Sequence, residues 1–183
     1  MHMKINNLFK LIIAVGVAEL AGVVGSLFTV LAIEGWYATL AKPALNPPSW
    51  VFGPVWTTLH LLIGLSLFLV WKNNWKVVNP VLEKTGKVWN QWSERLWRGD
   101  LQKVNAIAIF AVQYILNIAW SFVFFRMHSP LLASFVILAL WVAILYTAIN
   151  FYRISKPAAY LLLPYIFWVS FAAYLNYAMW ALN

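Results

Sequence analysis

Apolar positions dominate this chain in five long runs, which short polar segments separate. The runs cover about 8–31, 51–72, 104–125, 130–151 and 157–181. Each run is long enough to cross the hydrocarbon core of a bilayer, which takes about 20 helical residues. Runs such as LLASFVILALWVAIL lack the strict alternation of a membrane β-strand. Because lipid offers backbone groups no hydrogen-bond partners, we expect these segments to be α-helices.

The sequence therefore predicts an all-α integral membrane protein, a five-transmembrane-helix bundle that forms a single domain over residues 1–183. Composition agrees, because 63% of the residues are hydrophobic and only 10% are charged, which is more apolar than a typical soluble domain. The basic start, MHMKINNLFK, resembles that of a signal peptide. The apolar run behind it is longer than a signal core, so we expect a retained first helix. No cysteine is present, which excludes disulfides and thiolate metal sites.

The basic residues are distributed unevenly between the two sides of such a bundle. Eleven of the 13 fall near the N-terminus, in the 73–103 connection or near the 152–156 turn: Lys4, Lys10, Lys72, Lys76, Lys84, Lys87, Arg95, Arg98, Lys103, Arg153 and Lys156. Only Lys42 and Arg126 fall on the other side. This bias predicts a cytoplasmic N-terminus, an outside C-terminus and a plasma membrane, such as the bacterial one. The basic residues border the lipid bilayer, so the net charge of +8 does not indicate nucleic-acid binding.

The 73–103 connection is long and carries an amphipathic pattern. Apolar or uncharged side chains recur at helical spacing at Thr85, Trp89, Trp92 and Leu96. Most charged residues of the segment fall elsewhere on the helical wheel. This pattern predicts a cytoplasmic loop with an interfacial amphipathic helix, which either anchors the loop or binds a partner or lipid.

Polar and aromatic side chains recur along one face of several predicted spans. In the span 104–125 this face carries Gln113, Asn117, Trp120, Ser121 and Phe124. Similar faces in the other spans carry Gly53, Trp56, His60 and Gly64; Trp141, Leu145, Ala148 and Tyr152; and Tyr165, Trp168, Ala172 and Asn176. An amide facing lipid is costly, so these faces should point into the bundle. They either line a cavity for a large flat ligand or serve only to pack the helices.

Two titratable side chains lie within the predicted spans. His60 has no second ligand at a metal-binding spacing, which favours a buried, hydrogen-bonded histidine over a metal or haem ligand, and no metal site is predicted. Glu19 has no basic residue in the neighbouring spans, and a proton relay is one alternative for it. The first span also carries small residues at every fourth position: Ala14, Ala18, Gly22 and Ser26. This face either packs inside the bundle or forms a homodimer.

The segment 46–56 reads NPPSWVFGPVW and precedes the second span. Prolines suit loops and helix beginnings, and Ser49 is a candidate N-cap. The prolines would fix the directions of Trp50 and Trp56. We therefore expect a stiff lid and one wall of a pocket, the alternative being an interfacial anchor at the start of a helix.

The order of these motifs resembles the translocator protein, or tryptophan-rich sensory protein, family, also called the peripheral-type benzodiazepine receptor family. The chain is most similar to bacterial members. The shared residues are Trp36-Tyr37, Lys42-Pro43, the 46–56 segment, Gln113, Leu116-Asn117, Trp120-Ser121, Phe124-Phe125, Leu163-Pro164-Tyr165, Trp168, Phe171-Ala172, Leu175-Asn176 and Trp180. The chain departs from the family in its long 73–103 connection and in Leu45, where an aromatic residue is common.

The resemblance implies a membrane receptor or sensor, often a homodimer, with a pocket beneath the first extracellular loop. The implied ligands are porphyrin-type tetrapyrroles (protoporphyrin IX or haem) and flat hydrophobic molecules of the isoquinoline carboxamide or benzodiazepine type, with no cofactor required. The implied ligand-binding residues are Tyr37, Trp50, Trp56, His60, Asn117, Trp120, Trp168 and Ala172. His60 stands where the family often has tyrosine.

Two other functions remain open. By resemblance, the chain could be a light- and oxygen-dependent porphyrin-degrading enzyme, with Trp56 and Trp168 as its redox-active residues. The sequence has no conventional acid–base or metal motif, so such chemistry would rest on the ligand and on tryptophan. The other alternative is a transporter of tetrapyrroles or lipids. Five spans without a visible internal repeat argue against a conventional secondary transporter.

Overall fold

The computed structural model describes residues 6–73 and 88–183, with side chains described over 6–73 and 104–183. All regular structure in these residues is helical. The long helices are α1 (Asn7–Ile33), α3 (Phe52–Lys72), α4 (Val88–Ser121), α5 (Pro130–Ile154) and α7 (Leu163–Leu182). The short elements are α2 (Trp36–Thr39), the 3₁₀ turn η1 (Ser49–Val51), the π-helical turn η2 (Phe122–Arg126) and α6 (Lys156–Tyr160).

The five predicted membrane spans are confirmed. Five helical segments of the described residues are long and apolar enough to cross a bilayer: Asn7–Ile33, Ser49–Lys72, Val104–Arg126, Pro130–Ile154 and Lys156–Leu182. Their bounds extend the predicted spans by a few residues at most. The chain is therefore an all-α integral membrane protein.

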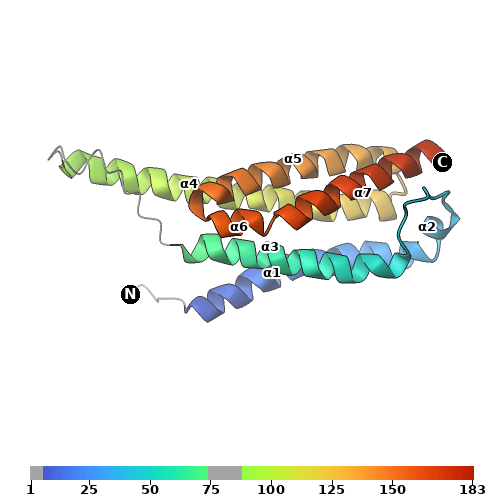
Figure 1. Ribbon diagram of the computed structural model, residues 1–183, viewed down its shortest axis with the longest axis horizontal. Coiled ribbons are helices and arrows are strands. Elements are labelled where there is room, and N and C mark those ends of the chain that lie inside the picture. The colour runs from blue at the N-terminus through green and yellow to red at the C-terminus, as the bar shows by residue number, and fades with distance from the viewer. Residues whose placement is uncertain (1–5, 74–87) are drawn as a thin grey trace.

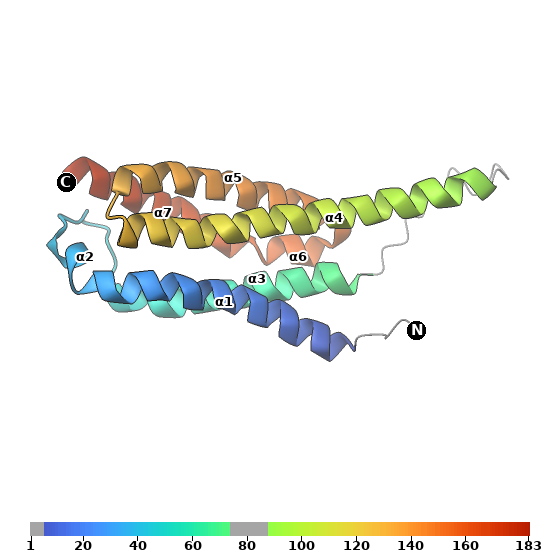
Figure 2. The same ribbon diagram turned by 180° about the vertical axis from the view of Figure 1, so that it is seen from behind.

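The long helices form two layers, with α1 and α3 in one and α4, α5 and α7 in the other (Figures 1 and 2). Around the bundle, α3 packs on α1, α1 on α4, α4 on α5, and α5 on α7. The circuit closes where α3 meets α6 and the start of α7. We call the end that carries α2 and the C-terminus the loop end.

The closest approach between α1 and α3 depends on Gly64. A Cβ atom at this position would lie 2.6 Å from Val15 Cα and 3.1 Å from the Ala14 carbonyl oxygen. Ala14 and Ala18 are fully buried. The small-residue face of the first span therefore packs inside the bundle at this depth, which answers the question that the sequence left open. Ser26, about two to three turns nearer the loop end, is exposed.

The prediction of an inward face on the fourth span is correct for Ala148, which is buried, and wrong for Leu145 and Tyr152, which are 37% and 45% exposed. Besides Ala148, the buried face of α5 carries Ala133, Ile137, Leu140, Ile144, Thr147, Asn150, Phe151 and Ile154. Because this helix is apolar on all sides, its sequence offered little contrast from which to read a direction.

Several helix ends differ from the predictions. The predicted fifth span is broken at Leu161–Leu162, where α6 ends and α7 begins with Pro164 in its first turn. Proline has no N–H to continue the hydrogen-bond ladder of α6, which accounts for the break. Ser49 does not cap α3, because its side chain makes no capping bond and the η1 turn stands before the helix. The third span ends in η2, where Met127 N donates to Phe122 O at 3.1 Å.

The helix predicted inside the 73–103 connection is present but is not a separate element. Its backbone is helical from Val88 and continues without a break into the third span as α4. Figure 2 shows this helix extending beyond the ends of its neighbours. Thr85 lies outside the described residues. The helix thus leaves the bundle along its own axis, and its interfacial placement stays a prediction.

We predict that Gly64→Ala destabilises the bundle, because the new methyl group would overlap the α1 backbone. Overpacking of this kind costs about 1–3 kcal/mol. Gly16→Ala is the matched control, since a Cβ there meets nothing within 4 Å. Thermal unfolding followed by circular dichroism in detergent should show a lower midpoint for Gly64→Ala alone. Equal midpoints for the two variants would contradict the close contact.

Candidate ligand-binding site

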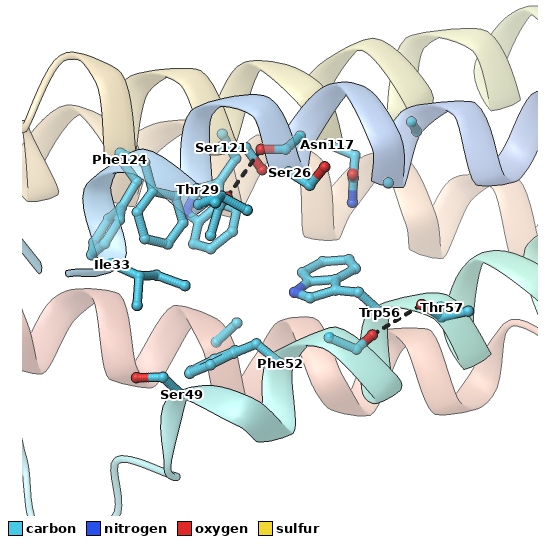
Figure 3. A pocket seen from close by; sticks show the side chains of 18 of the residues that line it. Ser26, Thr29, Ile33, Ser49, Phe52, Trp56, Thr57, Asn117, Ser121 and Phe124 are labelled. Atoms are coloured by element: carbon cyan, nitrogen blue, oxygen red, sulfur yellow. Dashed lines mark hydrogen bonds between the residues drawn. The ribbon is translucent and has the colours of Figure 1, made fainter.

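A cavity of about 470 Å³ lies in the loop-end half of the bundle. Residues of α1, α3, α4, η2 and α7 surround it, and Tyr37 of α2 contributes from the loop. Figure 3 shows the indole of Trp56 projecting into this space from α3. The volume falls within the range of about 300–1,000 Å³ that is usual for small-molecule sites. Trp50 lines the cavity and is 74% exposed, so the cavity is open to the surroundings.

The structure brings together seven of the eight predicted ligand-binding residues. Those that line the cavity are Tyr37, Trp50, Trp56, His60, Asn117, Trp120 and Ala172. Trp168 is not among the described lining residues. Its ring packs instead against Phe52, with centroids 6.1 Å apart, and against Phe171 at 5.7 Å. Trp168 therefore lies behind the cavity wall in this structure.

Aromatic rings form a continuous wall around Trp56. The Trp56 ring stacks on His60 with centroids 5.5 Å apart and an interplanar angle of 26°. Trp120 lies 6.3 Å from it on α4, and Tyr165 lies 6.2 Å from it on α7. Rings at these separations attract one another and present flat apolar faces. Such a wall suits a ligand that is itself flat and mostly apolar.

Interhelical hydrogen bonds fix this wall. Trp120 Nε1 donates to Asn176 Oδ1 at 3.0 Å, which joins α4 to α7. Asn176 Nδ2 donates in turn to Pro130 O and Ser134 Oγ, both at 2.7 Å, which adds α5. Asn117 Nδ2 donates to the Tyr165 hydroxyl at 2.8 Å. A wall ordered before binding loses little entropy when a ligand arrives.

The loop above the cavity is also held in place. Tyr37 is 3% exposed, and its hydroxyl donates to Asn46 Oδ1 at 2.9 Å. Burial raises the pKa of the Tyr37 phenol, and its hydrogen bond to Asn46 offsets part of this shift. The phenol therefore keeps its proton at neutral pH and can act as a donor. Asn183 ties the same loop to α7 by accepting from Ala41 N at 2.9 Å.

His60 is buried without a hydrogen-bond partner. Its side chain is 4% exposed, and neither ring nitrogen has a partner among the described residues. The Asn117 side chain and the Trp56 backbone lie beside the ring, but neither completes a hydrogen bond of acceptable geometry. The prediction of a hydrogen-bonded histidine is therefore wrong. Gly22 makes room for the ring, since a Cβ there would lie 2.7 Å from His60 Nδ1.

Sequence reasoning missed the large contribution of α1 to the cavity. The lining residues of this helix are Glu19, Ala21, Gly22, Val23, Gly25, Ser26, Thr29, Val30 and Ile33. The sequence pattern indicates helix packing for Gly22 and Ser26, whereas both line the cavity together with Glu19. The spacing of three or four residues from Glu19 through Gly22 and Ser26 was the signal in the sequence that these residues share one face.

Within the described residues, no three potential metal-ligating side chains lie together.

Comparisons with known proteins agree on one family. The model of the TspO/MBR family matches residues 14–181. The tryptophan-rich protein TspO of Chlorobaculum tepidum is 38% identical, over 97% of this chain and 98% of the relative. The human translocator protein is 34% identical, over 81% of this chain and 75% of the relative. The tryptophan-rich sensory protein of Cereibacter sphaeroides is 30% identical, over 82% of this chain and 78% of the relative.

We predict that Asn176→Ala destabilises the bundle more than Asn150→Ala does. Both amides are buried, but Asn176 links three helices, whereas Asn150 donates only to Tyr146 O of its own helix. Interhelical hydrogen bonds in membranes contribute about 0.6 kcal/mol each on average. The loss should therefore exceed that of the control by about 1–2 kcal/mol in thermal unfolding. Equal losses would mean that the Asn176 network contributes no more than a bond within one helix.

Proposed function

Because this chain belongs to the TspO/MBR family, we propose that its cavity binds porphyrin-type tetrapyrroles, such as protoporphyrin IX or haem, and other flat hydrophobic molecules. Family membership supports a membrane receptor or sensor role. Synthetic ligands of the isoquinoline carboxamide and benzodiazepine type are also mostly apolar ring systems. They would occupy the same space beneath the loop that carries Tyr37.

The observation that carries this proposal is the ring wall around an open space. Trp56, Trp120 and Phe124 line the cavity, and their rings pack on one another or on neighbouring rings. A tetrapyrrole is a planar ring system that gains most from contact with ring faces. The walls are held by buried hydrogen bonds between helices, so they need little rearrangement to receive a planar ligand. Open access beside Trp50 offers a way in.

We predict that protoporphyrin IX quenches the tryptophan fluorescence of the purified protein saturably in the dark. Ala172→Phe should weaken this binding at least about tenfold, since the new ring would fill part of the cavity. Ala111→Phe is the matched control, because Ala111 is exposed on α4 and lies away from the cavity. Trp56→Phe and Asn117→Ala should weaken binding less.

Two results would contradict the proposal. The first is quenching that never saturates, which would indicate partition of the porphyrin into detergent. The second is an equal effect of the two phenylalanine substitutions, which would place the binding site elsewhere. Either result would mean that the aromatic wall serves only to pack the helices.

Photo-oxidative porphyrin breakdown is the competing function. The indole of Trp56 is in the cavity wall, where a bound porphyrin would meet it. Trp168 is separated from the cavity by Phe52, which makes direct contact between Trp168 and a ligand difficult in this arrangement. Illumination after dark binding distinguishes the functions. At saturating porphyrin, a loss of the porphyrin absorption band that slows in Trp56→Phe would favour an enzyme, and a stable band would favour a receptor. Slowing in Trp168→Phe as well would show that Trp168 takes part despite its place behind Phe52.

We further propose that the N-terminus is cytoplasmic, with the loop end outside and the chain in a bacterial plasma membrane. The distribution of basic residues supports this orientation. A homodimer is also proposed. Ala14 and Ala18 are buried within one chain, so any dimer would use another face.

A further inference from the structure

Three polar side chains from three helices line the cavity near its deeper end. Glu19 comes from α1, His60 from α3 and Asn117 from α4. Gly22, one turn after Glu19, faces the His60 ring. Glu19 and His60 therefore lie about one helical turn apart along the cavity. All three lie well inside their membrane spans. We call these three residues the polar end.

Glu19 has no partner within the protein. Among the described residues its carboxyl group makes no hydrogen bond and no ion pair. The described basic residues lie at the span ends or in loops: Lys10, Lys42, Lys72, Arg126, Arg153 and Lys156. A carboxyl group inside a membrane span is costly, and it usually marks a functional site. Glu19 is only partly exposed and lines the cavity, so a bound molecule could supply its partner.

The polar end offers more hydrogen-bond acceptors than donors. The Asn117 amide uses one N–H of its Nδ2 group to donate to Tyr165, which leaves its oxygen and one further N–H. Neutral His60 has one donor and one acceptor nitrogen, neither of which is paired. Ionised Glu19 adds two acceptor oxygens and no donor. A ligand group placed here therefore finds mainly acceptors.

We propose that the polar end is a subsite for an amine or another hydrogen-bond donor on a flat ligand, with Glu19 as the residue that selects for charge. A cationic amine would neutralise the carboxylate and use acceptors that are otherwise unpaired. A ligand carboxylate would meet Glu19 as a like charge. This inference rests on the proposed binding of flat molecules and adds the polarity of the ligand. It implies that a porphyrin binds with its propionate groups away from Glu19.

Three pyrene probes with the same flat ring test the proposal: pyrenemethylamine, methylpyrene and pyreneacetic acid. Pyrene accepts energy from tryptophan, so binding to the full chain in neutral detergent can be followed by tryptophan quenching. The wild-type protein should bind the amine most tightly and the acid most weakly. Glu19→Gln should weaken amine binding about tenfold and leave methylpyrene within about twofold.

Two further variants make the test specific. Glu34→Gln makes the same chemical change on an exposed residue at the end of α1 that does not line the cavity, so it should preserve the order of affinities. Glu19→Asp keeps the charge and should also preserve the order. It guards against a general effect of changing this position, and thermal unfolding of each variant checks its fold.

Each outcome either supports or overturns the proposed amine subsite at the polar end. An order of affinities that is the same in the wild type and in Glu19→Gln would overturn the proposal, as would a wild-type protein that binds all three probes equally. In both cases binding of methylpyrene would leave the proposed function standing. No saturable binding of any probe would overturn this inference and the proposed function together.

Discussion

The contact between Gly64 of α3 and the backbone of α1 decides where this bundle is closed and where it is open. At that depth the α1 backbone at Val15 and Ala14 lies so close to Gly64 that a Cβ atom there would overlap it. About one and two turns nearer the loop end, α3 carries His60 and Trp56, whose rings lie against the cavity. A helix pair that is closed by glycine at one level and held apart by rings at the next leaves room for a cavity. The fold thus makes the site by changing residue size along a single interface.

The absence of water inside a membrane explains how the polar groups divide. Backbone and side-chain polar groups in such an interior must find partners within the protein or the ligand. Asn117 and Asn176 find theirs on neighbouring helices and fix the wall. His60 and Glu19 find none among the described residues, and both line the cavity. Paired groups therefore give the site its shape, and the two unpaired groups in the cavity wall face the space that a ligand would fill. Gln113 Oε1 and Trp168 Nε1 are also buried without a partner among the described residues, but they do not line the cavity.

Hydropathy predicted the fold well, because lipid imposes both the length and the helical form of each span. The polar face of the third span also predicted its direction, since Gln113, Asn117 and Trp120 are all buried. The direction of α5 could not be predicted, because a uniformly apolar helix has no contrasting face. Nor could the break before Pro164 or the π-helical turn that brings Phe124 and Phe125 to the cavity wall. The position of Trp168 could not be predicted fully from its motif. Helical spacing predicts which face of the helix carries Trp168, but it does not predict that the ring of Phe52 packs against it.

The central claim is that a flat ligand occupies the space between α1 and α3, and ligand protection of two neighbouring threonines tests it most directly. Thr57 lines the cavity and Thr58 does not, although both are exposed and each bonds to its own helix. The chain has no cysteine, so Thr57→Cys and Thr58→Cys each provide a single thiol. The account predicts that protoporphyrin IX in the dark slows maleimide labelling of the Thr57→Cys protein and leaves that of Thr58→Cys unchanged. Equal labelling rates with and without ligand at both positions would contradict it.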